Sequence, residues 1–403
     1  MFKRATTINT DEQAIRDILS RGIEDVFVKE SLEAKLKSGK QLRIKLGIDP
    51  TSKNLHIGRA IPLWKLKAFQ DLGHQIVLIV GDFTAQIGDA SDKLQKRPML
   101  TEEAVQENLK EYKKIIGKVI DVSKAEFVFN SKWLSKLTFK DVCQLAEAFS
   151  LQQMISRRNF KDRLDKGEEI SLRELMYPLM QGYDSVAVKA DVEIGGFDQL
   201  FNLKAGRIIQ KYYGMPEQDI ATFQMLEGTD GRKMSSSWGN VININDEPND
   251  MYGKVMSVRD ELLVKYFTLC TQISLEKIDA IKKELESGVN PKDIKMRLAR
   301  EMVTMYYGKE KAEKAEENFV NTFKKGGIPD DAEEGEVRAG TLLVDLLLEK
   351  KIIASKSEWR RLIDEQAVSD MESNEKITDP FFKIEKKGVY KIGKRRFIKI
   401  TVK

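Results

Sequence analysis

The stretch Leu42-Arg-Ile-Lys-Leu-Gly-Ile48, followed after a helical segment by Gln75-Ile-Val-Leu-Ile-Val80, decides the fold of this chain. The first run alternates apolar and polar residues as a strand does, and the dipeptide Asp49-Pro50 ends it. The second is a continuous apolar run, which is typical of a buried parallel strand. Between them a helical pattern runs over residues 56–73. Strand, helix and strand within about 40 residues predict a βαβ unit.

The composition of the chain predicts a soluble protein of more than one domain. It has 403 residues, 41% of them hydrophobic and 33% charged, which suits two or three domains with a sizeable core. We expect no membrane span and no signal peptide, because no run of about 18 apolar residues occurs and no apolar core follows Met1. Cys143 and Cys270 have no metal or redox spacing, so a reducing, cytoplasmic location is expected.

The order of sequence patterns predicts the domain organisation. We expect an α/β fold with a Rossmann-like parallel-sheet domain at 1–240, which begins with helices at 11–40. Residues 127–129 and 187–188 are weaker strand candidates in it. An α-helical domain at 241–329, an acidic linker at 330–337 and a small basic α+β domain at 338–403 follow.

The end of the chain is strongly basic. Residues 381–403 hold nine Lys and Arg against one acid, Glu385, while the whole chain carries a net charge of +5. The remainder is therefore slightly acidic. A basic block beside an acidic body predicts a module that binds a polyanion such as RNA, and the alternative is a solvated lysine-rich surface.

The segment His56-Ile-Gly-Arg59 opens the predicted helix directly after the first strand. A helix N-terminus offers unpaired N–H groups and a partial positive charge, which suit phosphate, and Gly58 lets a ligand approach the backbone. His56 and Arg59 are three residues apart and so share one side of the first turn. A phosphate site is one reading, and an ordinary capped helix with a surface histidine is the other.

A second glycine-bearing segment, Gly228-Thr-Asp-Gly-Arg-Lys-Met-Ser-Ser-Ser-Trp-Gly-Asn240, comes much later in the chain. In it Lys233 precedes a run of hydroxyl side chains. Such a loop can close over a polyphosphate through charge and hydrogen bonds, and the alternative is a solvated linker. In this order, the two segments predict two halves of one ATP site.

Tyr177, Gln181 and Asp184 are spaced to share one face of a predicted helix, with Pro178 in its first turn. That face suits a small amphipathic ligand, and Asp184 can accept a hydrogen bond from a phenol. A plain polar helix face is the alternative. The glycines of Gly195-Gly-Phe-Asp-Gln199 permit close backbone approach to a ligand, against the alternative of a tight capped turn.

The loop after the apolar strand carries Thr84 and Asp89, and then Lys93 and Arg97. Ligands in open α/β sheets bind at the carboxyl ends of strands, which is where this loop falls. Lys93 and Arg97 have two readings, as mobile phosphate contacts or as part of a solvated loop.

Together these motifs resemble the class I aminoacyl-tRNA synthetases, and among them the tyrosyl-tRNA synthetases of bacterial type. His56-Ile-Gly-Arg59 is similar to the HIGH signature, and Lys233-Met-Ser-Ser-Ser237 to the KMSKS signature. Residues 177–184 and 195–199 resemble the tyrosine pocket of that family. The basic end resembles its small RNA-binding fold, so the resemblance covers nearly the whole chain.

The resemblance implies a role for each matching residue. Contacts to the ATP phosphates and the departing pyrophosphate fall to the catalytic residues His56, Arg59, Lys93, Arg97, Lys233, Ser235 and Ser236. Tyrosine binding falls to Thr84, Asp89, Asn130, Tyr177, Gln181, Asp184 and Gln199, with Asp184 at the phenol. Binding of the rest of ATP falls to Gly47, Asp49, His56, Gly58, Gly196, Asp198, Lys233 and Met234.

Three positions depart from the family pattern. Arg59 replaces the second histidine of HIGH; arginine is always charged and binds phosphate through two N–H groups, so we expect function with a different affinity for ATP. Ser236 replaces the second lysine of KMSKS and removes one cation from the loop. Lys45 stands where some members carry a tyrosine near the substrate phenol, and it either takes that place or is a strand-surface residue.

The resemblance implies a two-step tyrosine–tRNA ligase that forms tyrosyl-adenylate from ATP and then charges tRNA. Its expected partners are tyrosine tRNA, L-tyrosine, ATP with Mg²⁺ and a second copy of the chain, without a tightly bound cofactor or a protein metal site. Residues 141–155 are either the dimer face or an internal helix. The alternatives in function are a tryptophanyl synthetase and an RNA-binding protein that has lost turnover.

Overall fold

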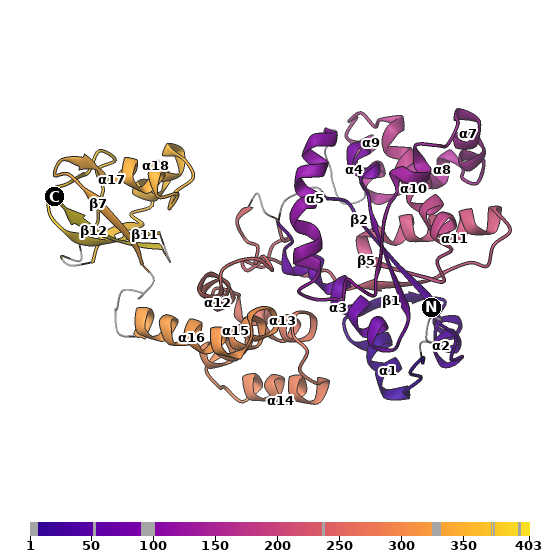
Figure 1. The fold of residues 1–403 in the computed structure, drawn as a ribbon, viewed down its shortest axis with the longest axis horizontal. Coiled ribbons are helices and arrows are strands. Elements are labelled where there is room, and N and C mark those ends of the chain that lie inside the picture. Colours follow the sequence, from indigo (N-terminus) through magenta and orange to yellow (C-terminus); the bar gives the residue numbers. More distant parts are fainter. Residues whose placement is uncertain are drawn as a thin grey trace. The chain divides into compact units, whose positions relative to one another are not determined.

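The computed structural model describes residues 7–50, 54–89, 101–235, 238–324, 332–371, 373, 375–393 and 396–403. The chain divides into two compact units. The first comprises Met1–Asn245 and Val258–Val289, and the second comprises Asp246–Ser257 and Asn290–Lys403. The first is built on a six-stranded sheet, and the second contains packed helices and a four-stranded sheet (Figure 1).

The six-stranded sheet of the first unit is parallel except at one edge, where β1 runs antiparallel to β6. The expected parallel α/β sheet is therefore confirmed. In spatial order its strands are β1 (Ile23–Phe27), β6 (Asp219–Phe223), β5 (Val192–Gly196), β2 (Arg43–Ile48), β3 (Gln75–Val80) and β4 (Glu126–Phe129).

The two strands expected from the apolar runs lie next to each other in the sheet. β2 pairs with β3 from Arg43 opposite Gln75 to Ile48 opposite Val80. β3 is buried from Ile76 onward, as a strand with neighbours on both sides and covered faces should be. Because parallel strands end at the same edge, the loops that follow β2, β3, β5 and β6 meet there, and these loops carry most of the motifs.

Helices pack closely against this sheet. α3 (Ile57–Asp71) joins β2 to β3 as expected, with Pro62 in its second turn. α10 (Leu172–Val188) and α11 (Leu200–Tyr212) approach each other at Gly182, where a Cβ atom would lie 2.7 Å from Cδ1 of Ile209. The first unit also contains α1 (Glu12–Ser20), α2 (Lys29–Lys37), α4 (Thr84–Ile87), α5 (Glu102–Ile116), α6 (Ser131–Leu134), α7 (Phe139–Glu147), α8 (Leu151–Ile155), α9 (Arg158–Asp165), η1 (Phe197–Gln199), η3 (Asp260–Leu262), α13 (Leu263–Cys270) and α14 (Leu275–Glu286).

The second unit combines helices with a small sheet. Its helices α12 (Pro248–Met256), α15 (Pro291–Tyr307) and α16 (Lys309–Lys324) pack on one another, as the helical pattern of this region predicts. Trp359, Leu347 and Ile398 belong to a separate apolar core beneath the sheet. In spatial order the sheet is β7 (Glu333–Val337), β12 (Arg396–Val402), β11 (Gly388–Ile392) and β9 (Val368–Asp370), accompanied by the pair β8 (Thr341–Leu342) and β10 (Lys383–Ile384) and by α17 (Leu343–Glu349) and α18 (Lys356–Asp364).

Several local expectations are wrong. Residues 11–40 are not all helical, because β1 lies between α1 and α2. Ala187 and Val188 form the last turn of α10 and not a strand. Pro178 lies well inside that helix, which begins at Leu172. Glu333–Val337, expected within an acidic linker, is strand β7 and pairs with β12. Among the described residues, no helix is both long and apolar enough to cross a membrane.

Candidate active site

A cavity of about 800 Å³ opens at the carboxyl ends of the strands of the first unit. It brings together motifs that are far apart in the sequence. Lys93, Arg97 and Ser236 lie outside the described residues. All other candidate residues line the cavity: Gly47, Asp49, His56, Gly58, Arg59, Thr84, Asp89, Asn130, Tyr177, Gln181, Asp184, Gly196, Asp198, Gln199, Lys233, Met234 and Ser235.

A chain of hydrogen bonds crosses the cavity wall between β2 and α10. The Tyr177 hydroxyl donates to Oδ2 of Asp49 at 2.9 Å, and the Thr84 hydroxyl donates to Oδ1 of Asp49 at 2.7 Å. Nδ2 of Asn130 donates to Oγ1 of Thr84 at 3.0 Å and to Oδ2 of Asp184 at 3.3 Å. Burial, together with the nearby carboxylate of Asp49, raises the pKa of the Tyr177 hydroxyl well above its usual range, so this group remains a donor.

Asp184 is a buried carboxyl at the end of this chain. Besides the bond from Asn130, it accepts a hydrogen bond from Nε1 of Trp133 at 2.7 Å. Burial raises the pKa of the Asp184 carboxyl to about 7, although the charge of Lys45 and these two hydrogen bonds act in the opposite direction. Such a group can accept a hydrogen bond from a phenol, and leaving it unpaired in a dry site is costly.

Trp133 does not line the cavity itself but donates a hydrogen bond to Asp184, which does, and sequence reasoning missed it. Its only signal is its position three residues after Asn130, on the short helix α6. The indole nitrogen has a single N–H and is donor-only, so its bond to Asp184 favours the ionised carboxylate.

A second polar cluster surrounds Asp89. Nε2 of Gln199 donates to Oδ2 of Asp89 at 2.8 Å, and Nδ2 of Asn202 donates to Oε1 of Gln199 at 3.1 Å. Gln199 closes η1 and Asn202 lies in the first turn of α11, so local helical spacing brings them together. Sequence reasoning missed Asn202. The cluster presents a carboxylate and a carboxamide to the cavity, which suits an ammonium and a carboxylate group of one ligand.

His56 stands at the N-terminus of α3 and faces the cavity, so the reading as a plain surface histidine is wrong. Burial, reinforced by the positive charge of Arg59, lowers the pKa of its imidazole to about 4. The ring is therefore neutral at physiological pH. Gly58 makes room for it, because a Cβ at this position would lie 3.2 Å from Nδ1 of His56 and 3.4 Å from Sδ of Met234.

Backbone pairing brings the later loop to the same place. The N–H of Ile57 donates to the carbonyl of Ile242 at 2.8 Å, and the N–H of Ile244 donates to the carbonyl of Leu55 at 2.9 Å. The segment that follows Lys233 thus lies along the start of α3. The two glycine-bearing segments are neighbours in the fold, as the prediction of one divided site requires.

Asn240 organises the loop that carries Lys233. Its Nδ2 donates to Oδ1 of Asp230 at 2.8 Å and to the carbonyl of Lys233 at 3.1 Å, and its Oδ1 accepts from the N–H of Ser235 at 2.8 Å. The bond from Asn240 is the largest of the effects that lower the pKa of Asp230 to about 2. Gly228 is needed beside it, because a Cβ there would lie 2.3 Å from Nδ2 of Asn240. Asn240 ended the quoted motif, but sequence reasoning assigned it no role.

Lys45 is fully buried, so the reading as a strand-surface residue is wrong. Its Nζ pairs with Oε1 of Glu193 at 2.9 Å and donates to the carbonyl of Gln181 at 2.9 Å. It therefore lies behind the helix face that carries Tyr177, Gln181 and Asp184.

The sheet, the cavity at its carboxyl edge and the two adjoining signature segments define an α/β ligase fold of the aminoacyl-tRNA synthetase kind. The family described as tRNA synthetases class I (W and Y), in which the letters stand for tryptophan and tyrosine, matches residues 37–324. The chain belongs to this family, and the resemblance expected from the sequence is confirmed.

Similar proteins cover nearly the whole chain. The tyrosine–tRNA ligase of Thermotoga maritima is 45% identical over 396 residues, which span 97% of this chain and 98% of that protein. The tyrosine–tRNA ligase of Carboxydothermus hydrogenoformans is 46% identical over 399 residues, spanning 95% and 97%. The crystal structure of the tyrosyl-tRNA synthetase of Archaeoglobus fulgidus, complexed with L-tyrosine, has the same fold, with a TM-score of 0.61 at 22% identity over 76% of this chain and 100% of that one.

Proposed function

We propose that the chain is a tyrosine–tRNA ligase that activates L-tyrosine with ATP and transfers the tyrosyl group to tyrosine tRNA. The observation that carries the proposal is the placement of Asp184. This carboxyl lies buried in the cavity that also holds His56 and Lys233, and it is bound by Trp133 and Asn130. A ligand with a phenol at one end and a reacting group at the other matches this arrangement.

In the proposed complex, Asp184 binds the phenol hydroxyl of tyrosine, with Thr84 and Asn130 beside it. Asp89 and the oxygen atoms of Tyr177 and Gln181 receive the α-ammonium group, because all three can accept a hydrogen bond from it. The amide of Gln199 lies near the substrate carboxylate.

Adenylation then joins the tyrosine carboxylate to the α-phosphorus of ATP as the bond to pyrophosphate breaks. The nucleophile is already an anion, so no general base is needed, and catalysis consists of positioning and of stabilising charge. His56 donates an N–H to phosphate as a neutral group, while Arg59 and Lys233 supply positive charge. We assign the pyrophosphate to Ser235, Ser236, Lys93 and Arg97, and the remainder of ATP to Gly47, Asp49, Gly58, Gly196, Asp198 and Met234.

Magnesium enters this scheme as the complex with ATP, held through the phosphates and water, because Mg²⁺ keeps much of its hydration shell in nucleotide sites. Among the described residues, no group of three or more His, Cys, Asp or Glu is placed to hold a metal ion. The ion would share with Arg59 and Lys233 the work of neutralising the phosphates.

In the second step, a ribose hydroxyl at the 3′ end of tRNA attacks the adenylate carbonyl and releases AMP. We propose that the helical domain at 241–329 recognises the anticodon and that the basic domain at 338–403 binds RNA phosphates, which makes affinity salt-dependent. We also propose a cytoplasmic homodimer. Leu151 supports the dimer, because it lies within the predicted face at residues 141–155 and is 61% exposed, and Phe139, just before that face, is 85% exposed.

The test is amino-acid-dependent exchange of labelled pyrophosphate into ATP, with tyrosine, phenylalanine and tryptophan in parallel. Exchange with tyrosine alone is expected. Exchange with tryptophan instead would make the chain a tryptophanyl enzyme. Exchange with none of them, together with retained tRNA binding, would replace the proposal with an RNA-binding protein on the same scaffold.

A further inference from the structure

Lys45 and Glu193 form an ion pair in the interior of the first unit. They lie opposite each other on the neighbouring strands β2 and β5, and neither side chain is exposed to solvent. Removing two opposite charges from water is unfavourable even when they pair well. An apolar pair of the same size would fill this space equally well. Packing alone therefore does not explain why both residues are charged.

The ammonium group of Lys45 has all three of its N–H bonds in use. One goes to Oε1 of Glu193 at 2.9 Å, one to the carbonyl of Gln181 at 2.9 Å and one to Oγ of Ser185 at 2.7 Å. No donor is left over for a substrate phenol. Lys45 therefore acts within the protein, beneath α10.

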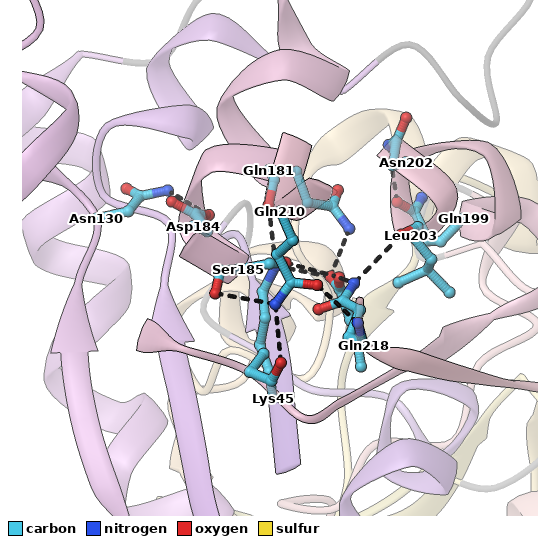
Figure 2. A network of polar contacts seen from close by, with 12 residues as sticks. Lys45, Asn130, Gln181, Asp184, Ser185, Gln199, Asn202, Leu203, Gln210 and Gln218 are labelled. Atoms are coloured by element: carbon cyan, nitrogen blue, oxygen red, sulfur yellow. Dashed lines mark hydrogen bonds and ion pairs between the residues drawn. The ribbon is translucent and has the colours of Figure 1, made fainter. Parts of the chain in front are cut away.

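Glu193 is surrounded by donors in the same way. Its Oε1 accepts from Nε2 of Gln181 at 3.1 Å as well as from Lys45, and its Oε2 accepts from Oγ of Ser185 at 3.1 Å and from Nε2 of Gln218. Figure 2 shows this network, in which β2, α10 and the segment before β6 converge. A carboxylate has no hydrogen to donate, so the atom of Gln181 that faces it must be the NH₂ group.

We infer that Glu193, with its charge balanced by Lys45, is a positioning residue that orients the side-chain amide of Gln181. With its NH₂ held by Glu193, Gln181 turns its carbonyl Oε1 away from that carboxylate and offers it to the cavity, which Gln181 lines. An ammonium group can only donate, so it needs this oxygen and would clash electrostatically with an NH₂ group.

The inference rests on the proposed function, in which Gln181 receives the α-ammonium group of tyrosine. The orientation of Gln181 by Glu193 would explain why the site selects a ligand with a free amino group. A carboxamide can present either its acceptor oxygen or its donor NH₂ group to a ligand, depending on how it is rotated. The buried carboxylate behind it removes the ambiguity, and Lys45 allows that carboxylate to stay charged in a dry place.

The test is the double variant Lys45→Met/Glu193→Gln, which removes both charges together and keeps side chains of similar length. The new amide donates as well as accepts, so Gln181 loses its fixed orientation. The Kd for tyrosine should rise on the order of 10- to 100-fold, as expected for the loss of a hydrogen bond to a charged group. Pyrophosphate exchange at saturating tyrosine and the KM for ATP should change by no more than about twofold.

A tyrosine analogue without the amino group, 3-(4-hydroxyphenyl)propionate, separates positioning from deformation of the cavity. Its inhibition constant should be the same for the double variant and the unmodified protein. An equal loss of affinity for tyrosine and for the analogue would overturn the inference, because it would mean that the cavity had changed shape. Unchanged affinity for tyrosine would overturn it as well.

Two further variants complete the test. Gln218→Leu removes another hydrogen bond to Glu193 without touching Gln181, so it should lower the Tm and leave the Kd for tyrosine unchanged. If the double variant does not fold, Glu193→Asp replaces it, because this variant keeps the negative charge but moves it away from Gln181 by one carbon. It should weaken the binding of tyrosine and leave the binding of 3-(4-hydroxyphenyl)propionate unchanged. Failure of the unmodified protein to bind tyrosine would count against the proposed function and not against the network.

Discussion

The indole Nε1 of Trp133 lies 2.7 Å from Oδ1 of Asp184 and donates a hydrogen bond to it. This bond favours the ionised carboxylate, whereas burial favours the neutral form and prevails, with a pKa of about 7. The state of the residue proposed to bind the phenol therefore depends on pH within the physiological range.

A pH dependence of tyrosine binding follows from this balance. The carboxylate is the better acceptor, so kcat/KM for tyrosine in pyrophosphate exchange should rise as pH increases through about 7. In Trp133→Phe a bond to the ionised form is lost, and the midpoint should move to higher pH. A profile whose midpoint is the same in both proteins would contradict the role of Trp133.

Discrimination between tyrosine and phenylalanine should depend on Asp184. Phenylalanine leaves this buried carboxyl without a partner, whereas Asp184→Ala removes the group and with it the penalty. The ratio of the kcat/KM values for tyrosine and phenylalanine should fall by about 100-fold or more in the variant. If the ratio is unchanged, the phenol binds elsewhere.

Loss of the Lys233 charge should affect chemistry more than binding. In single-turnover experiments, Lys233→Ala should lower the rate of adenylate formation on the order of 100-fold, with the Kd for tyrosine changed by less than about twofold. Arg232→Ala is the matched control, because this neighbouring cation pairs with Asp230 and stacks on Trp238. Equal effects of the two variants would point to general disturbance of the loop.

His56 should stay neutral at pH 6.5, since burial lowers the pKa of its ring to about 4; burial also lowers the pKa of the other histidine, His74. NMR titration should find the midpoint of His56 near 4. The folded protein then takes up protons less readily than the unfolded chain, so this contribution to stability is complete above pH 6.5 and is lost as pH falls toward 4. A His56 midpoint at or above 6.5 would refute the environment described for it.

Removal of the small sheet should separate the two steps of the reaction. A chain ending at Lys324 retains the whole cavity of the first unit, so its rate of pyrophosphate exchange should stay within about twofold of the full chain. Charging of tRNA should fall at least tenfold, because phosphate contacts dominate affinity for nucleic acid. Full charging by the shortened chain would exclude the basic domain from tRNA recognition.

The sequence predicted the parts of the fold that local patterns encode. The apolar runs located β2 and β3, and the helical pattern between them located α3. β1 was missed because it lies at the sheet edge and its acidic residues Glu24 and Asp25 are exposed, which hides a strand pattern. Ala187 and Val188 were wrongly predicted to be a strand. They end a helix that packs against the sheet, so they are apolar as a buried strand would be.

The members of the site were predictable where a motif carried them, and their roles remain predictions. Trp133 and Asn240 were missed because no short sequence motif links them to the groups they bind. Trp133 donates to the carboxylate of Asp184, and Asn240 donates to the backbone carbonyl of Lys233. The environment of Lys45 was equally inaccessible. A lysine within a strand normally indicates an exposed face, and only the folded sheet brings Glu193 opposite to it.

In the small sheet β12, formed by residues 396–402, lies between β7 and β11. During translation, β9 and β11 leave the ribosome before β12 and can already pair with each other, but β7 has no partner in this sheet until β12 emerges. This part of the protein must therefore mature after synthesis has passed the whole segment, whereas β2 and β3 can pair long before. Newly made chains would complete the sheet and cavity of the first unit early and the small basic sheet late.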